Sequence, residues 1–158
     1  MEIITIPENL KAKISKVKDL EGNVIRDMEE IILEDHRSFE FRFISPSDLE
    51  RREKEIWELQ DQIFKLIGGR PSKVREIKIS ETMRRDPSSF QEADGLWQES
   101  TKSIIIKRDQ LRNLEDFAGT LIHESVHARS GEIDVTLSFE KALTIVIGTI
   151  CSRIIRNK

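Results

Sequence analysis

Apolar residues recur along the chain with two different periods, which predict strands and helices in a mixed order. Apolar residues at every second position predict a strand with one buried face. The segment SFEFRFI (38–44) alternates in this way and places Phe39, Phe41 and Phe43 on the face expected to be buried. Three later runs are also predicted strands, at residues 75–80, 95–100 and 103–108. Within the first 25 residues, a hairpin turning at Gly22-Asn23 and a helix over ENLKAKISK both fit.

Apolar residues three or four positions apart predict helices. The predicted helices cover residues 27–34, 45–69, 114–130 and 136–156. Ser45 is placed to cap the second of these, and Asn113 and Gly131 are placed to begin and end the third. The last helix is apolar on several sides, so it is expected at the centre of the core.

This order of helices with a small sheet predicts the α+β class. At 158 residues, the chain suits a single domain, 1–158, with its own core. We divide it into an N-terminal subregion, 1–70, and a region, 71–158, that carries the candidate chemistry. Trp57 and Trp97 are expected to pack within this domain rather than to bind a ligand.

Composition and charge narrow the choice of partners and compartment. The net charge is −3, so no overall basic field attracts nucleic acid or anionic lipid. The longest apolar stretch, ALTIVIGTIC (142–151), is shorter than the roughly 20 residues that a membrane span needs. The N-terminal segment lacks signal-peptide features, and the lone Cys151 is expected as a buried thiol. A cytoplasmic protein is therefore expected.

The third predicted helix contains the pattern His-Glu-x-x-His in LIHESVHARSG (121–131). On a helix, His123 and His127 lie one turn apart and opposite the apolar stripe, where two imidazoles can reach one ion at about 2.0–2.1 Å. Glu124 points about 100° away and is placed to take a proton from water at that ion. This arrangement favours a metal site over a solvated helix face. Gly119, near the same face, is expected to let another backbone approach.

A longer segment around this motif resembles a known family. GLWQESTKSIIIKRDQLRNLEDFAGTLIHESVHARSG resembles the active-site region of zincin metallopeptidases, in which an edge strand precedes the His-Glu-x-x-His helix. DVTLSFEKALT is similar to the glutamate-bearing helix of the gluzincin branch. More narrowly, the arrangement resembles compact zincin-like domains joined to ATP-binding proteins of the Hsp90 and histidine-kinase type. The resemblance covers about residues 75–150 and implies a zincin-like fold. In that fold, a small mixed sheet packs against the motif helix and a C-terminal core helix.

The resemblance also implies roles for individual residues. His123 and His127 match the two zinc ligands, and Glu124 matches the general base. Glu140, 13 positions after His127, is the best match to the third ligand. Asp134 is its rival, as a ligand, as an acceptor for an imidazole N–H or as a turn residue.

Two departures from zincin patterns limit the resemblance. The metzincin branch requires a glycine and a ligand at positions that here hold Ser130 and Ile133. The chain has no tyrosine, so a tyrosine cannot stabilise the oxyanion as it does in several zincin families. Arg129 and His36 are alternatives for this role, although a solvated or structural role suits each of them better.

The expected function is that of a zinc-dependent metallopeptidase-like hydrolase. Zinc would lower the pKa of water, and Glu124 would accept a proton as hydroxide attacks a peptide carbonyl. The resemblance to domains joined to Hsp90-type ATPases implies that an ATP-binding Hsp90- or histidine-kinase-like partner or domain gates the site. This chain has no phosphate-binding glycine loop of its own, and residues 45–67 are the expected contact surface. The alternative is a non-catalytic, zinc-stabilised interaction module, which a closed site with both Asp134 and Glu140 as ligands would favour.

Overall fold

The computed structural model describes residues 10, 13, 17–26, 31, 34, 39–85 and 91–156. The chain divides into two compact units, one formed by Met1–Phe39 with Arg84–Gln91 and the other by Glu40–Met83 with Glu92–Lys158. The single-domain assignment stays a prediction.

The first unit contains the hairpin near the N-terminus. Lys18 and Val24 form an antiparallel bridge, and Gly22 turns the chain between them with a φ of 90°. Glycine adopts this left-handed conformation without a steric penalty. The hairpin prediction is therefore confirmed, whereas most of the predicted helix at 27–34 lies outside the described residues.

The second unit is built on a four-stranded mixed sheet in the order β1-β2-β4-β3. The strands are β1 (Phe43–Ile44), β2 (Glu76–Ser80), β3 (Gly95–Gln98) and β4 (Ser103–Lys107). The central pair, β2 and β4, is parallel, while β1 and β3 lie antiparallel at the two edges. Three fully buried isoleucines, Ile104–Ile106, explain the central place of β4, because β-branched side chains favour a buried strand. The three strand predictions after residue 70 and the α+β class are confirmed.

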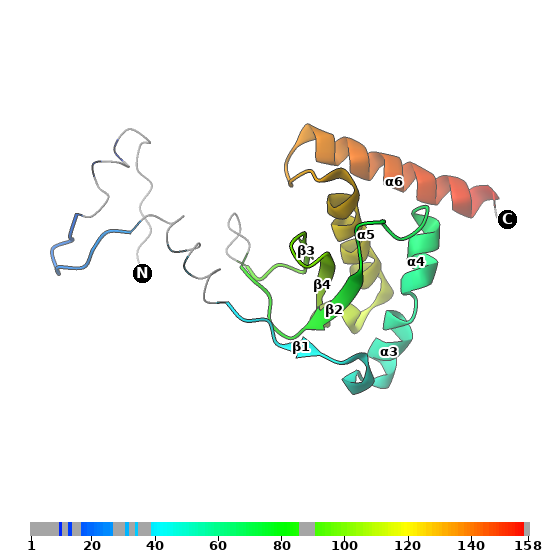
Figure 1. The fold of residues 1–158 in the computed structure, drawn as a ribbon, viewed down its shortest axis with the longest axis horizontal. Helices are drawn as coiled ribbons and strands as arrows, with labels where there is room; N and C mark the ends of the chain where they lie inside the picture. The colour runs from blue at the N-terminus through cyan, green and yellow to red at the C-terminus, as the bar shows by residue number, and fades with distance from the viewer. Residues whose placement is uncertain are drawn as a thin grey trace. The chain divides into compact units, whose positions relative to one another are not determined.

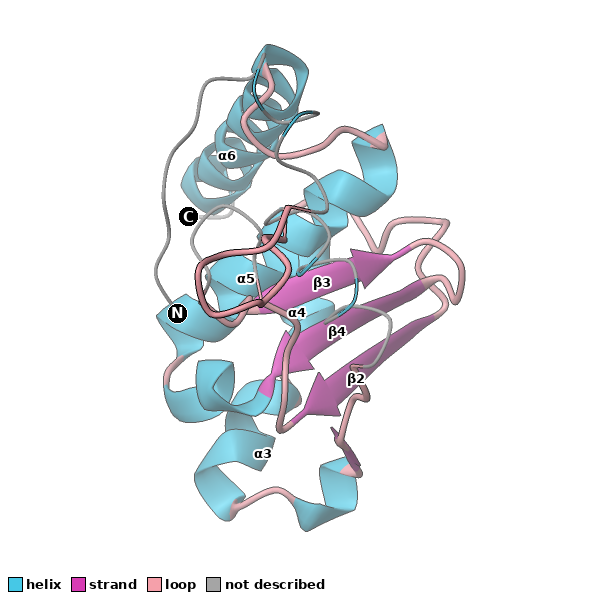
Figure 2. Ribbon diagram, turned by 90° about the vertical axis from the view of Figure 1, so that its left-hand side faces the viewer, coloured by secondary structure: helices cyan, strands magenta, loops and turns pink. Residues whose placement is uncertain are grey.

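Helices of the second unit surround a core that also includes the sheet. They are η1 (Pro46–Asp48), α3 (Arg51–Trp57), α4 (Gln60–Leu66), η2 (Arg108–Arg112), α5 (Leu114–Ser130) and α6 (Leu137–Arg156). Figures 1 and 2 show α5 lying across one face of the sheet. Phe117 and Leu121 of α5 are fully buried in this core. Trp57 packs on the Phe117 ring with the ring centroids 5.9 Å apart, which confirms its packing role.

The predicted aromatic strand is wrong except for its last two residues. Strand β1 pairs with β2 only through Phe43 and Ile44. Phe43 is 51% exposed, so the aromatic face is not buried. Its ring stacks on Phe41 and lies 5.0 Å from the Lys78 ammonium, a cation–π contact that an exposed ring can make.

The single helix predicted at 45–69 is instead a 3-10 turn followed by two short helices. Ser45 caps the 3-10 turn, and Glu50 begins α3 through a capping box. The Gln60 side-chain amide donates to the Trp57 carbonyl at 2.9 Å, where α3 ends. Such local side-chain hydrogen bonds compete with a continuous helix. The glycine pair ends the segment as predicted, with φ values of 94° and 109°.

Helix α6 is not central to the core, contrary to the sequence prediction. Only Phe139 and Val146 are buried along its length, and Cys151 is exposed rather than buried. Large exposed apolar side chains on α6 and the preceding loop are Ile133, Val135, Leu137, Ile145, Ile147, Ile154 and Ile155. The apolar pattern shows how hydrophobic this helix is, but not which of its faces the rest of the chain covers. Among the described residues, no helix is long and apolar enough to cross a membrane.

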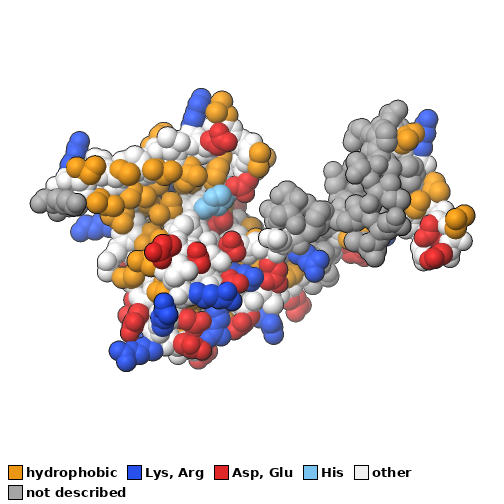
Figure 3. Space-filling model, turned by 180° about the vertical axis from the view of Figure 1, so that it is seen from behind, with side chains coloured by type: hydrophobic (Ala, Val, Ile, Leu, Met, Phe, Trp, Pro, Cys, Tyr) orange, Lys and Arg blue, Asp and Glu red, His pale blue; other side chains and the backbone are white. Residues whose placement is uncertain are grey.

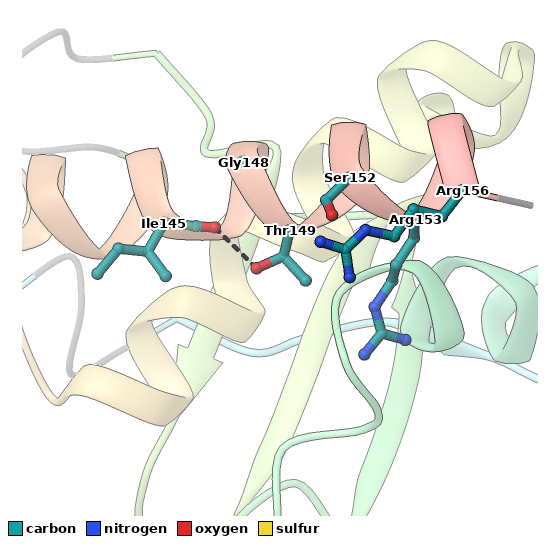
Figure 4. Close-up of a pocket in the computed structure, with 6 residues that line it drawn as sticks. All are labelled: Ile145, Gly148, Thr149, Ser152, Arg153 and Arg156. Carbon is teal, nitrogen blue, oxygen red and sulfur yellow. Dashed lines mark hydrogen bonds between the residues drawn. The ribbon is translucent and has the colours of Figure 1, made fainter.

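An open pocket lies along the C-terminal half of α6. Its lining residues are Ile145, Gly148, Thr149, Ser152, Arg153 and Arg156. In Figure 4 the Thr149 hydroxyl is hydrogen-bonded to the Ile145 carbonyl, so the helix itself satisfies this group. None of the predicted site residues lines this pocket.

Candidate metal centre

Helix α5 carries the His-Glu-x-x-His motif and begins and ends where its sequence predicts. The Asn113 side chain accepts a hydrogen bond from the Asp116 N–H at 2.8 Å, which caps the helix. At the other end, Gly131 adopts a φ of 72° and its N–H donates to the His127 carbonyl at 2.9 Å. Because Phe117 and Leu121 anchor one side of α5 in the core, the two histidines of the motif lie on another side, while Glu124 lies close to the buried side.

Two imidazole nitrogens and one carboxylate oxygen form a compact triangle. Nε2 of His123 lies 3.0 Å from Nε2 of His127. Oδ1 of Asp134 lies 3.1 Å from the first nitrogen and 3.2 Å from the second. Asp134 belongs to the connection between α5 and α6, so two helices and their loop meet at this point. Figure 3 shows histidine atoms at the surface of this face, with hydrophobic side chains gathered beside them.

The size of this triangle fits the coordination shell of a small divalent cation. Ligands about 2.05 Å from one ion lie about 2.9 Å apart at a right angle and about 3.4 Å apart in a tetrahedron. The three observed separations, 3.0–3.2 Å, fall between these limits. Imidazole nitrogen and carboxylate oxygen are also donor atoms that zinc accepts in proteins. The residues present therefore fit zinc.

The other ring nitrogen of His127 has a partner that fixes the ring. Nδ1 of His127 lies 2.7 Å from the Glu132 carbonyl oxygen. Because a carbonyl can only accept, Nδ1 carries the proton, and in the neutral ring Nε2 keeps its lone pair toward the triangle. Metal-ligating histidines usually have such a partner. Burial lowers the pKa of His123, although Asp134 opposes this shift, so the neutral form of that ring is favoured as well.

Phe139, which the sequence analysis did not single out, packs against both imidazoles. Its ring centroid lies 4.3 Å from that of His127 and 4.9 Å from that of His123. Because Phe139 is the residue of α6 that faces the site, Glu140 points about 100° away around the helix. Glu140 is exposed, and among the described residues the carboxylate within ion-pair distance of the two imidazoles is that of Asp134. The structure thus brings Asp134, and not the favoured Glu140, to the two histidines.

Glu124 lies beside the triangle and is nearly buried. Its carboxylate has an oxygen within 4.8 Å of a ring nitrogen of each histidine, and the residue is 7% exposed. Oε2 accepts a hydrogen bond of 2.7 Å from the Trp97 backbone N–H on the edge strand β3. Burial raises the pKa of Glu124 to about 7, because the charged form is poorly solvated there. A carboxylate held in this way is suited to exchanging a proton near neutral pH.

The close contact between β3 and α5 requires a glycine at position 95. A Cβ atom added to Gly95 would lie 2.5 Å from Cγ2 of Thr120 and 2.9 Å from Cγ of Glu124. The prediction of a close backbone approach at Gly119 is wrong, because a Cβ there would have no neighbour within 4 Å. The role of Gly95 is hard to predict from sequence, because this glycine begins strand β3, far along the chain from the motif.

We expect Gly95→Ala to destabilise the protein by about 1–3 kcal/mol, the usual cost of overpacking a tight contact. Gly119→Ala is the matched control in α5, and it should stabilise by about 0.5–1 kcal/mol because alanine favours a helix interior and the space is open. Denaturant unfolding of both variants measures the two changes. In a Thr120→Ala background, Gly95→Ala should cost less. Equal effects of the two glycine substitutions would contradict the close contact.

Of the two candidates for oxyanion stabilisation, Arg129 has another role in the structure, and His36 is not described. The Arg129 guanidinium donates to the Ile67 carbonyl at 2.8 Å and also to the Gly69 carbonyl. These bonds hold the Arg129 guanidinium at the C-terminal end of α4, so Arg129 joins α5 to that end of α4. His36 lies outside the described residues.

The site therefore offers a set of three donor atoms for one cation and a buried carboxylate beside it. These groups come from α5 and from the connection to α6, and Trp97 and Phe139 hold them in place. Burying the Glu124 carboxylate costs free energy, and the hydrogen bond from the Trp97 N–H offsets part of that cost. Comparison with protein-family models, curated proteins and solved structures finds no match for this chain.

Proposed function

We propose that this protein is a zinc-dependent hydrolase of peptide bonds with a zincin-like fold. The observation that carries the proposal is the buried Glu124 carboxylate within 4.8 Å of the ring nitrogens of His123 and His127. A second feature supports it. An edge strand, β3, precedes the motif helix along the chain, as the resemblance to zincins implies, and its Trp97 N–H donates to that carboxylate.

Three side chains of this chain would hold the zinc ion: His123, His127 and Asp134. Asp134 takes the place that the sequence analysis gave to Glu140, because its Oδ1 lies against both imidazoles. When bound, zinc acts as a Lewis acid that lowers the pKa of water and polarises a carbonyl.

Glu124 would move the proton. Its Oε2 is occupied by the Trp97 N–H, and Oε1 accepts no hydrogen bond from the described residues. Oε1 would take a proton from the water molecule whose oxygen attacks the peptide carbonyl carbon. It would then give that proton to the amine nitrogen as the C–N bond breaks. The substrate is a peptide or protein segment, which strand addition at the outer edge of β3 would hold in an extended form.

The first test of this proposal is metal content. We expect one zinc per chain after elemental analysis of the full-length protein, or after titration of the metal-free protein with zinc. His127→Ala should abolish this binding, because it removes one corner of the triangle and the ring that Glu132 orients. Iron in place of zinc would point to a different chemistry, since two histidines and a carboxylate also hold Fe(II). A protein that binds neither metal would contradict the proposal.

A second candidate function is a zinc-stabilised interaction module without catalysis. The exposed apolar side chains of α6 favour it, because a helix that is apolar on several sides is usually buried against something. An ATP-binding partner or domain of the Hsp90 or histidine-kinase type remains the proposed partner under either function. Helix α6 is a better candidate contact surface than residues 45–67. Zinc binding without any peptide hydrolysis, with or without that partner, would favour this second function.

A further inference from the structure

The backbone of the connection between α5 and α6 contains an unusual residue. Val135 has a φ of 62°, in the left-handed region, and its side chain is 96% exposed. Among the described residues other than glycine, Lys102 alone shares a positive φ, and it lies in a turn between two strands. A left-handed conformation is disfavoured by roughly 5- to 30-fold for an L-residue, and more strongly for a β-branched one. Packing does not hold Val135 in this state, because its side chain contacts so little.

Hydrogen bonds fix the connection on both sides of Asp134 and Val135. Before them, the Glu132 carbonyl accepts from Nδ1 of His127, and the Glu132 carboxylate accepts from the Ser138 hydroxyl. After them, the Thr136 hydroxyl donates to the Ile133 carbonyl at 2.8 Å and accepts from the Phe139 N–H at 3.2 Å. Neither set of bonds uses the Asp134 carboxylate. The left-handed turn at Val135 is thus the step that joins these two anchored ends.

The turn at Val135 affects the direction of the preceding side chain, Asp134. Its Oδ1 reaches both imidazoles although its side chain is 57% exposed, so packing around the side chain does not set this orientation. A right-handed or extended residue at 135 would redirect the chain between the two anchors and move the preceding carboxylate.

We propose that Val135 is a positioning residue of the metal site, and that its unfavourable left-handed backbone turns Asp134 toward His123 and His127 and makes metal binding weaker than this site could achieve. The inference rests on the proposed zinc site and adds a determinant of its affinity. Strain lowers affinity only when it is released as the cation leaves, so we infer that the connection relaxes at Val135 without a cation and is strained again on binding. A residue that adopts the left-handed state readily would leave more of the binding free energy for the cation.

The test is a zinc titration of the full-length protein against a chromophoric chelator. Val135→Asn and Val135→Gly should bind zinc about 3- to 10-fold more tightly, because asparagine and glycine tolerate positive φ. Val135→Pro should bind more than about 10-fold more weakly, because proline fixes φ near −65°. Lys102→Gly is the matched control, since it relieves a similar positive φ in the turn between β3 and β4, and zinc affinity should stay within about twofold of the wild type.

A double-mutant cycle separates positioning of Asp134 from general damage. If Val135 acts through Asp134, adding Val135→Pro to Asp134→Ala should cause no further loss of affinity. Additive losses would overturn the inference, and so would unchanged affinity in both Val135→Asn and Val135→Gly. If Val135→Pro does not fold, the zinc affinities of Val135→Asn and Val135→Gly still test the inference. A wild-type protein that binds no zinc would instead defeat the proposed function, which keeps the two failures distinct.

Discussion

Replacing Asp134 with alanine is expected to lower zinc affinity by more than about 100-fold. Loss of a residue that only hydrogen-bonds a metal ligand typically costs about 10- to 100-fold, so a larger loss identifies a direct ligand. The physical reason is that Asp134 Oδ1 is the carboxylate oxygen that completes the triangle, 3.1 and 3.2 Å from the two imidazole nitrogens. The measurement is a competition titration of the metal-free, full-length protein with zinc.

Glu140→Ala is the matched control, because it removes another carboxylate six positions away. Glu140 lies exposed in the first turn of α6, where it adds at most about 0.3–1 kcal/mol to helix stability through the dipole. Its removal should change zinc affinity by less than about threefold, as expected for a surface carboxylate away from the cation. The reverse result, with zinc released by Glu140→Ala and retained by Asp134→Ala, would restore the gluzincin arrangement that the resemblance implies.

Features of the site that depend on local sequence could be predicted. The bounds of α5 follow from a capping asparagine, a stopping glycine and a regular apolar stripe, all within one segment. The same regularity places His123 and His127 one turn apart, away from the buried side. Strands β2 and β4 were also predictable, because runs of β-branched residues suit a buried strand in nearly any context.

The carboxylate that lies against the two histidines could not be predicted in this way. Spacing from His127 and likeness to the gluzincin helix both favoured Glu140, but the outcome depends on where the chain turns between the helices. That turn uses a left-handed Val135, a conformation that no sequence rule assigns to valine. It also depends on Phe139 filling the position in α6 that a ligand would need.

The exposure of α6 and the close contact at Gly95 also depend on how distant segments pack. A helix that is apolar on several sides can lie in a core or expose part of its surface, and periodicity does not distinguish these cases. The need for glycine at 95 arises because Thr120 and Glu124 approach it from α5. Neither residue is near position 95 in the sequence. In both cases the missing information is which distant segments touch.

The second large effect is expected for Glu124→Gln, which should retain zinc and lose hydrolysis by about 10²- to 10⁴-fold, the usual contribution of a general acid–base group. Glutamine keeps the size of the side chain and an oxygen that can accept the Trp97 N–H, so the contact between β3 and α5 should persist. Its amide cannot take a proton from water. We therefore expect unchanged zinc content and an unfolding midpoint at or above that of the wild type near neutral pH, because glutamine removes a buried charge whose pKa is raised to about 7. Peptide cleavage, measured by mass spectrometry on a mixed peptide substrate, should be lost.

Glu140→Gln is the control for this substitution, because it makes the same chemical change on an exposed position of α6 and should leave cleavage within about twofold of the wild type. Three outcomes distinguish the roles that Glu124 can have. Retained zinc with lost cleavage identifies the proton-transferring group. Lost zinc identifies a ligand, which would mean that the carboxylate leaves Trp97 to join the triangle. Equal cleavage by the variant and the wild type would remove Glu124 from the chemistry. The buried carboxylate would then serve only to join α5 to the edge strand, as the interaction-module function requires.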